Sequence, residues 1–391
     1  MSGAAPVPRS DVETVRAAPT RIVAGLMSGT SMDGIDVAIC RVASGEPRLE
    51  ELIGARTIPW DERLAARLLR SHEADALELA RLNRLTGEAF AAAVAGLAAE
   101  LGVRVELVGS HGQTVAHEHG LATMQIGEAA VLALRLGCPV VSDFRQNDIA
   151  AGGCGAPLVP IVDRWLLARP GVGIVALNLG GISNLAALPP REAATTPVIG
   201  FDCGPGNMVL DELARRHSGG VESCDRDGRL AAAGRVDPGL LARLLAEPAL
   251  NSVPPRSLGR EQYGAAFVDD LLARRAPTSE GDWQDLFATM TELTVQAVFG
   301  AYRRFVTPVL EVGELIASGG GARNGELMRR LGAALAPLPV VTSDRYGLPV
   351  DFKEAIAFAL LASARLDRVP ANLPEVTGAD RRVLLGKLTE C

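Results

Sequence analysis

The chain has 391 residues, of which 48% are hydrophobic and 22% charged, so it is long enough for two or three domains with sizeable cores. Its formal net charge is -7 and its isoelectric point is near 5.4, which argues against nucleic acid or an anionic membrane as the main partner. The six cysteines show neither a Cys-x-x-Cys pair nor zinc-ligand spacing, so we expect reduced thiols.

The N-terminal segment carries no targeting signal that we can identify. Residues 1–20 are polar and lack the apolar core of a secretory signal, so we expect a disordered extension. The longest apolar stretch, Ala89–Ala99, is too short to cross a bilayer. We therefore expect a soluble cytoplasmic protein that binds no membrane.

The first structured segment is predicted to be a hairpin. The apolar run Ile22–Leu26 predicts a buried strand, residues 27–34 are small or polar, and Ile35–Ile39 predicts a return strand. Asp33-Gly34 between apolar runs is typical of a tight turn. A tip without bulky side chains lets backbone N–H groups approach a phosphate, although an ordinary turn is the alternative. The sequence contains no Walker pattern, which excludes a P-loop.

Two polar segments follow predicted strands in the same half of the chain. Ser110–Thr114 comes after the strand at 105–108 and suits contacts to sugar hydroxyls, with a structural role as the alternative for His111. Gln125 is expected at the start of a helix. Asp143–Asp148 follows a strand at 140–141, and Arg145 either binds a phosphate or carboxylate or pairs with a neighbouring aspartate.

A second hairpin repeats the first. Ile174–Leu179 predicts a buried strand, Gly180–Asn184 a small polar tip, and Leu185–Leu188 a return strand. The repetition indicates an internal duplication, in which two hairpin tips could hold a phosphate chain from both sides. Strands that alternate with helices over the whole chain predict an α/β fold with mixed sheets flanked by helices.

Three further segments could carry chemistry. Asp202 lies in Gly200–Asn207, which we expect to form a glycine-rich loop before a helix capped by Asn207; Asp202 suits a general base or, alternatively, a ligand of turn amides. Gly319-Gly320-Gly321 joins a strand to a helix and suits either a nucleoside site or a tight turn. Glu354 opens the helix 352–366 and either reaches a metal or caps that helix.

We expect the chain to divide near residue 150, where the run Gly152–Pro157 suits a hinge. The predicted lobes are residues 21–150, joined by about 375–391 through a returning strand at 383–388, and residues 151–374.

Taken together, these segments resemble the anhydro-N-acetylmuramic acid kinase family of the actin, sugar kinase and chaperone ATPase superfamily. The resemblance runs from about residue 21 to the C-terminus, and Asp-Phe-Arg with Gly-Phe-Asp-x-Gly-Pro-Gly-Asn is its most specific part. The matching stretches are Met27–Asp36, Ser110–Thr114, Gln125–Gly127, Asp143–Pro160, Asn178–Asn184, Gly200–Asn207, Gly319–Asn324 and Lys353–Phe358.

This resemblance implies a two-lobed ribonuclease H-like fold of the actin and hexokinase type, a homodimer, and a kinase that uses ATP and Mg²⁺. The implied reaction opens 1,6-anhydro-N-acetylmuramic acid with water and phosphorylates O6, with Asp202 as the base that activates the water. Asp33 and Glu354 are the implied metal ligands.

The remaining implied site residues form two sets. Those near ATP are Gly29, Thr30, Ser31, Met32, Asp33, Gly34, Ile35, Asp36, Asn178, Gly180, Gly181, Ser183, Asn184, Gly319, Gly320, Gly321 and Asn324. Those near the sugar are Ser31, His111, Gln113, Gln125, Arg145, Asp148, Gly204 and Asn207.

The chain departs from the family pattern at Cys154, where relatives commonly carry glutamine, and in its N-terminal extension. Its ending, Val383–Lys387, is similar to Gram-positive and fungal branches, and the fungal branch includes levoglucosan kinases. A kinase for levoglucosan or another 1,6-anhydrosugar is therefore the alternative, and a non-catalytic nucleotide-binding protein of the superfamily is a further one.

Overall fold

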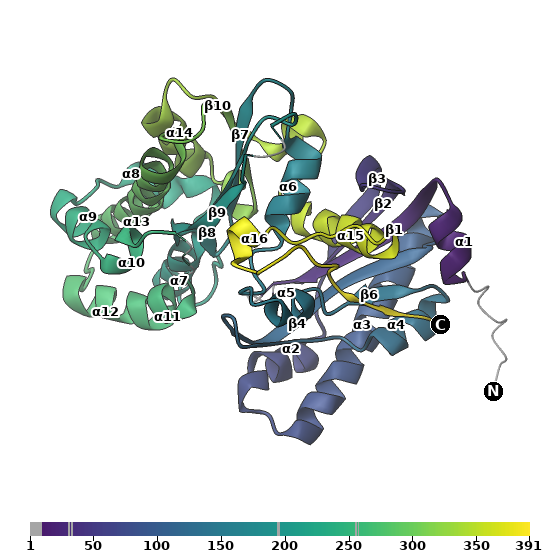
Figure 1. Ribbon diagram of the computed structural model, residues 1–391. Coiled ribbons are helices and arrows are strands. Elements are labelled where there is room, and N and C mark those ends of the chain that lie inside the picture. The colour runs from purple at the N-terminus through teal and green to yellow at the C-terminus, as the bar shows by residue number, and fades with distance from the viewer. Residues whose placement is uncertain (1–9, 30–31, 33, 194–195, 255, 257) are drawn as a thin grey trace. The chain divides into compact units, whose positions relative to one another are not determined.

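The structure, a computed structural model, describes residues 10–29, 32, 34–193, 196–254, 256 and 258–391 (Figure 1). The chain forms two compact units, the first built from residues 1–166 and 352–391 and the second from residues 167–351. No helix in the described ranges combines the length and apolar character needed to span a bilayer.

The first unit contains a mixed sheet in the order β12-β6-β4-β1-β2-β3, with β5 paired to β4. Strands β1, β2 and β3 are antiparallel, whereas β4 runs parallel to β1 and β6 parallel to β4. The strands are β1 (Thr20–Ser28), β2 (Ile35–Ala43), β3 (Arg48–Ile58), β4 (Leu107–Glu118), β5 (Ala122–Ile126), β6 (Val140–Ser142) and β12 (Lys387–Thr389). The helices are α1 (Val12–Ala17), α2 (Glu62–Leu69), α3 (Ala76–Leu101), α4 (Ala129–Leu136), α5 (Gln146–Ala150), α6 (Val159–Leu167), α15 (Lys353–Leu366) and α16 (Pro374–Thr377).

Successive residues of β1 face opposite sides of the sheet, one covered by α3 and the other by α15. Ala24 and Leu26 belong to the buried core that Phe90 of α3 completes. Gly25 faces the opposite way, where α15 packs against β1, β2 and β4 (Figure 1). A Cβ at Gly25 would overlap the carbonyl oxygen of Ala355, so α15 lies against bare backbone.

The second unit repeats the strand arrangement of the first, with the order β11-β10-β7-β8-β9. An antiparallel run β7-β8-β9 is extended by β10 parallel to β7 and β11 parallel to β10, which confirms the predicted duplication of a mixed sheet. The strands are β7 (Gly173–Leu179), β8 (Ile182–Leu188), β9 (Ile199–Pro205), β10 (Val312–Ser318) and β11 (Val340–Thr342). The helices are α7 (Asn207–His217), α8 (Arg229–Ala233), α9 (Pro238–Leu245), α10 (Pro248–Asn251), α11 (Arg260–Tyr263), α12 (Ala265–Arg275), α13 (Glu280–Ala301) and α14 (Gly325–Leu335).

Three predictions about the organisation of the chain are wrong. The N-terminal extension contains α1, whose first turn is capped by the Asp11 carboxylate accepting from the Thr14 N–H. The division of the chain falls after Leu166 and not near residue 150, and the chain returns to the first unit at Phe352 and not near residue 375. The reason is packing, because α15 is the helix that covers the first sheet. The chain does return to the first sheet as a strand, but this strand is β12 at Lys387–Thr389 and not residues 383–388, and it pairs antiparallel with β6.

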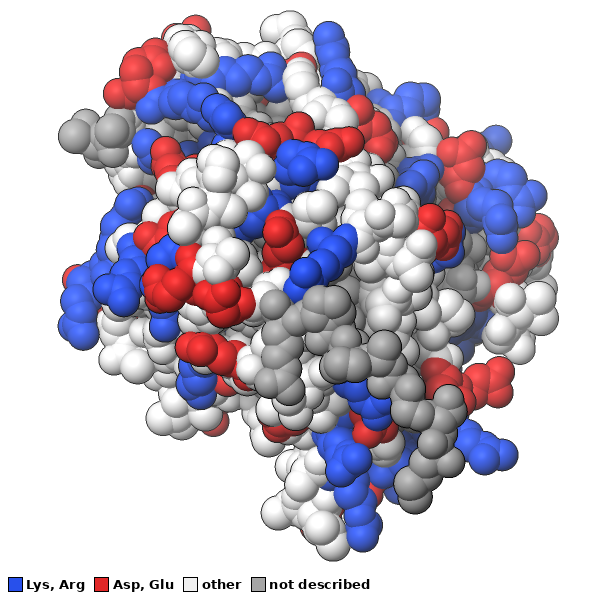
Figure 2. Space-filling model, turned by 90° about the vertical axis from the view of Figure 1, so that its right-hand side faces the viewer, with Lys and Arg blue, Asp and Glu red and all other residues white. Residues whose placement is uncertain are grey.

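Positive and negative side chains are intermingled on the described part of the face in Figure 2. Exposed ion pairs of the described residues include Arg56 with Glu100 and Arg67 with Glu78. Each such exposed pair stabilises the fold by roughly 0–1 kcal/mol, so the packed cores dominate stability.

Replacing Gly109 with alanine should destabilise the first unit by about 1–3 kcal/mol or more, because the new Cβ would overlap the Phe358 carbonyl on α15. The control is Gly96→Ala on α3, where an added Cβ meets no atom within 4 Å. That substitution should stabilise by about 0.5–1 kcal/mol. Urea unfolding measures both, and equal effects of the two substitutions would contradict the packing argument.

Candidate functional site

The tip of the first hairpin is longer than a two-residue turn. Strand β1 ends at Ser28 and β2 begins at Ile35, so the connection covers residues 29–34. Met32 has a φ of 59°, whereas Gly34 lies outside the positive-φ region that a tight Asp-Gly turn requires. Thr30, Ser31 and Asp33 lie outside the described residues.

The base of this tip is fixed by side chains from other elements. The Ser28 hydroxyl donates to the Gly34 carbonyl oxygen at 3.1 Å and accepts from the Trp60 indole N–H at 3.3 Å. The Gln113 amide of β4 donates to the Gly29 carbonyl oxygen at 3.4 Å. The structure therefore brings Gln113, predicted to touch the sugar, next to the predicted phosphate hairpin.

Two further carboxylates predicted near ATP or its metal, Asp36 and Glu354, lie on different elements, β2 and α15. Asp36 accepts a hydrogen bond of 2.5 Å from the Thr57 hydroxyl on the edge strand β3. Glu354 lies in the first turn of α15, where a carboxylate also interacts favourably with the helix dipole. In the described ranges, no group of three or more possible metal-binding side chains occurs.

Arg145 and His111, both predicted to contact the sugar, contact each other. The Arg145 guanidinium lies 3.0–3.2 Å from His111 Nε2 and donates to the Gly155 carbonyl oxygen at 2.9 Å. The suggested ion pairs of Arg145 with Asp143 or Asp148 are not what holds it, since Asp143 lies 3.2 Å from Lys387. Burial lowers the pKa of Arg145 to about 10, and the charge of Glu354 opposes that shift.

The environment of His111 keeps its ring neutral. Burial and the nearby Arg145 charge lower the pKa of His111 to about 3. His111 Nδ1 lies 2.9 Å from the Gly112 carbonyl oxygen, so Nδ1 carries the proton and Nε2 presents a lone pair to Arg145. The ring also packs on Phe358 of α15, with centroids 4.6 Å apart. His111 thus orients Arg145.

Asp148 is fully buried, and both of its carboxylate oxygens bind the first unit itself. One oxygen accepts from Thr377 and Asn372 at 2.8 and 2.9 Å, and the other accepts from the Gly155 N–H at 2.8 Å. These contacts give Asp148 a structural role in holding the 152–155 loop that binds Arg145.

Gln125 lies on strand β5, not at a helix start, because residues 122–126 pair with β4. Its register partner is Thr114, whereas Gln113 pairs with Ile126, so the two glutamines face opposite sides of the hairpin. The Oε1 atoms of both are buried and have no hydrogen-bond partner among the described residues. An unpaired buried acceptor is costly, which makes both amides candidates for a polar ligand.

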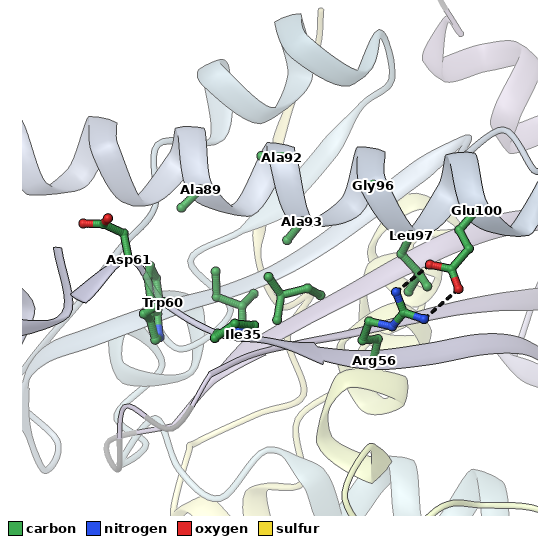
Figure 3. Close-up of a pocket in the computed structure, with 12 residues that line it drawn as sticks. Ile35, Arg56, Trp60, Asp61, Ala89, Ala92, Ala93, Gly96, Leu97 and Glu100 are labelled. Carbon is green, nitrogen blue, oxygen red and sulfur yellow. Dashed lines mark hydrogen bonds and ion pairs between the residues drawn. The ribbon is translucent and has the colours of Figure 1, made fainter. Parts of the chain in front are cut away.

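A cavity of about 410 Å³ lies on the first unit between α3 and strands β2 and β3 (Figure 3). Ala93 and Leu97 point into it from α3, and Trp60 and the Arg56–Glu100 pair border it (Figure 3). Of the described residues predicted near ATP, Ile35 lines this cavity. The side chains that carry the predicted chemistry lie elsewhere.

The second unit brings three predicted segments into contact. The tip of its hairpin is Gly180-Gly181, whose carbonyl oxygens accept from the N–H groups of Gly206, Asn207 and Met208 at 2.7–3.1 Å. The Asn207 amide donates to the Leu179 carbonyl oxygen at 3.2 Å. Cβ atoms at Gly319 and Gly321 would overlap this same hairpin and Asn207, so the triple glycine packs directly on it.

Several predicted roles in this unit change. Asn207 is the first residue of α7, and its N-cap is Gly206. Ser183 and Asn184 lie on strand β8, where the Ser183 hydroxyl donates to the Gly204 carbonyl oxygen at 2.9 Å. The Asn324 side chain caps α14 by accepting from the Leu327 N–H at 3.0 Å.

Asp202 lies on strand β9 and not on a loop, because residues 199–205 pair with β8 and place Asp202 opposite Asn184. Its carboxylate accepts from the Leu258 N–H at 2.7 Å. Its backbone carbonyl accepts from the Arg256 Nε–H at 2.6 Å. Sequence reasoning missed Arg256, because this contact spans more than 50 residues and Pro-Pro-Arg-Ser forms no recognisable motif.

Comparison with known proteins identifies the relatives of this chain. The family described as "Anhydro-N-acetylmuramic acid kinase" matches residues 21–390. Proteins of that name from Salinibacter ruber and Caldanaerobacter subterraneus subsp. tengcongensis are 43% and 39% identical, each over 94% of this chain and over 96% and 97% of their own. A solved structure of the activator of 2-hydroxyisocaproyl-CoA dehydratase from Clostridium difficile with bound ADPNP covers 89% of this chain and 96% of its own, with 12% identity and a TM-score of 0.42.

The buried neutral His111 should make stability depend on pH. Its pKa is lowered to about 3 in the folded state, so between the unfolded value near ~6.5 and pH 3 only the unfolded chain binds the proton. The stabilisation is therefore complete above pH ~6.5 and is lost at up to ~1.4 kcal/mol per pH unit as the pH falls. Urea unfolding measures the free energy of unfolding of the parent protein and of His111→Gln from pH 7 to 5. The parent value minus the variant value should decrease by up to ~1.4 kcal/mol per pH unit over this range. A constant difference would contradict the assignment.

Proposed function

Since this chain belongs to the anhydro-N-acetylmuramic acid kinase family, we propose that it is an ATP-dependent kinase for 1,6-anhydro-N-acetylmuramic acid. The proposal is carried by sequence identity of about 40% to named kinases over nearly the whole chain. Water and ATP would convert the anhydrosugar into N-acetylmuramic acid 6-phosphate and ADP. Such a reaction serves the recycling of cell-wall sugars.

Asp202 is the proposed general base. It would take a proton from a water molecule as the water oxygen bonds to C1 of the sugar. The C1–O6 bond then breaks, and O6 attacks the γ-phosphorus of ATP as ADP leaves. The position of Asp202 on β9, one strand from the Gly180-Gly181 tip, supports this assignment.

The glycine turns of the second unit suit the phosphates and nucleoside of ATP. An added Cβ would make only ordinary van der Waals contacts, at 3.6 Å from the nearest atom at Gly180 and at 3.4 Å at Gly320, so packing within the unit does not require glycine at either position. The first hairpin, residues 29–36, is the second proposed contact of the phosphates. Asp33 and Glu354 supply the oxygen ligands that Mg²⁺ prefers, and the bound ion would neutralise phosphate charge.

The first unit supplies the proposed sugar contacts. Arg145 offers a fixed guanidinium for a carboxylate such as the lactyl group of muramic acid. The unpaired Oε1 atoms of Gln113 and Gln125 could accept from hydroxyl or amide groups. His111 and Asp148 would act through Arg145 and the loop at Gly155. We also propose a cytoplasmic homodimer, in keeping with the family resemblance and the need for ATP.

Incubation of the purified protein with ATP, Mg²⁺ and 1,6-anhydro-N-acetylmuramic acid should yield a sugar 6-phosphate and ADP in equal amounts, measured by mass spectrometry. Asp202→Asn should lower kcat by about 10²- to 10⁴-fold, because the base is lost while the shape is kept. Turnover of levoglucosan without turnover of the muramic sugar would overturn the proposed substrate. Equal rates for parent and Asp202→Asn would remove Asp202 from the mechanism.

Asp33→Ala should weaken the use of Mg·ATP more than the binding of sugar, because Asp33 is proposed to hold the metal. We expect the KM for Mg·ATP to rise and the sugar affinity to stay within about twofold, measured by steady-state kinetics and calorimetry. Glu51→Gln is the control, since Glu51 is an exposed carboxylate of the edge strand β3 that pairs with Arg41. Unchanged nucleotide affinity and rate in Asp33→Ala would exclude this role.

A further inference from the structure

Arg256 makes an unusual set of contacts around the strand that carries Asp202. Its Nε–H donates to the Asp202 carbonyl oxygen at 2.6 Å, and one Nη donates to the Cys203 carbonyl oxygen at 3.1 Å. The other Nη donates to the carbonyl oxygens of Leu250 and Ser252 at 2.7 and 3.0 Å. One guanidinium therefore joins β9 to the end of α10, using the fixed fork of donors that only arginine has.

Two aromatic rings fix the plane of this guanidinium. Its central carbon lies 5.2 Å from the centroid of Phe201 and 5.6 Å from that of Phe305. Cation–π contact adds to the hydrogen bonds. Burial lowers the pKa of Arg256, whereas the negative charge of Asp202 acts in the opposite direction. The Asp202 carboxylate is thus close enough to interact with the cation.

The main chain of Arg256 and of Leu258 also contacts Asp202. The Asp202 N–H donates to the Arg256 carbonyl oxygen at 3.4 Å, and the Leu258 N–H donates to the Asp202 carboxylate at 2.7 Å. Arg256 therefore binds the main chain of Asp202, and Leu258 binds its side chain. A shift of Arg256 would move both the strand and the donor that orients the carboxylate.

We propose that Arg256 is a positioning residue for Asp202, which fixes the carboxylate through β9 and the Leu258 N–H and keeps it anionic through its charge. This inference rests on the proposed role of Asp202 as the general base. A base must lie within about 3 Å of the proton it removes, and a displacement of about 1 Å can lower a rate by about 10²-fold. Arg256 would act without touching the sugar or ATP.

Two substitutions separate position from charge. Arg256→Lys keeps the cation but loses the fork, so kcat should fall by about 10- to 100-fold with the KM for Mg·ATP unchanged and the acidic limb of the pH–rate profile in place. Arg256→Gln also loses the charge, so its acidic limb should move to higher pH, because a carboxylate without a nearby cation protonates more readily.

Arg304 provides the matched controls. It stacks on Phe305, as Arg256 does, but donates its hydrogen bonds to Asn251 and not to strand β9. Arg304→Lys and Arg304→Gln should keep kcat within about twofold and leave the pH profile unchanged. Circular dichroism and thermal melting report whether each variant is folded. If Arg256→Gln does not fold, Arg256→Lys alone tests the positioning role.

The Asp202→Asn background completes the test. If Arg256 acts through the base, adding Arg256→Lys to Asp202→Asn should lower the residual rate by less than about twofold. A parent-like kcat in folded Arg256→Lys, an unshifted acidic limb in folded Arg256→Gln, or an equal loss in the presence and absence of Asp202 would overturn the proposal. Failure of the parent protein to phosphorylate the anhydrosugar would instead overturn the proposed function.

Discussion

The first unit is organised around a contact in which a helix lies directly on the backbone of two strands. Gly25 of β1 and Gly109 of β4 are register partners, and each faces a carbonyl oxygen of α15. Any side chain at either position would push the helix away. The axis of α15 is therefore set by two glycines on adjacent strands, and everything carried by that helix takes its position from them.

Helix α15 transmits this placement to the polar residues of the unit. At its start, Lys353 forms a buried ion pair of 2.9 Å with Asp163 of α6. Helix α6 lies where the chain leaves the first unit, and α15 begins where the chain returns to it. Such a pair fixes a position more than it adds stability, because burying the charges offsets most of their attraction. One turn later, Phe358 packs on His111 and so supports the Arg145 guanidinium.

The second unit uses glycine for a different purpose. Gly206 and Gly319 let three turns from β7-β8, α7 and β10 meet so closely that a Cβ would strike backbone or an asparagine side chain. The result is a surface of main chain with few side chains. The two units therefore share a strand order but differ in their polar groups. These groups are buried side chains in the first unit and main-chain groups of glycine turns in the second.

The sequence predicts what depends on local pattern and misses what depends on distant contacts. The hairpins at Ile22–Ile39 and Ile174–Leu188, their repetition, and the helix over 352–366 follow from apolar runs and turn residues, and the structure has them. Asp202 was expected on a loop because glycines surround it, but pairing with β8 overrides that tendency. Arg256 and the roles of His111 and Asp148 depend on contacts across many residues, which no local pattern encodes.

The discontinuity of the first unit has a consequence for synthesis of the chain. The second unit is the continuous stretch 167–351, so all of it leaves the ribosome before α15 and β12 are made. Since domains generally fold as units during translation, the inserted unit can form while the first sheet still lacks its covering helix and its edge strand. The nascent chain then leaves the backbone at Gly25 and Gly109 uncovered until its last forty residues emerge.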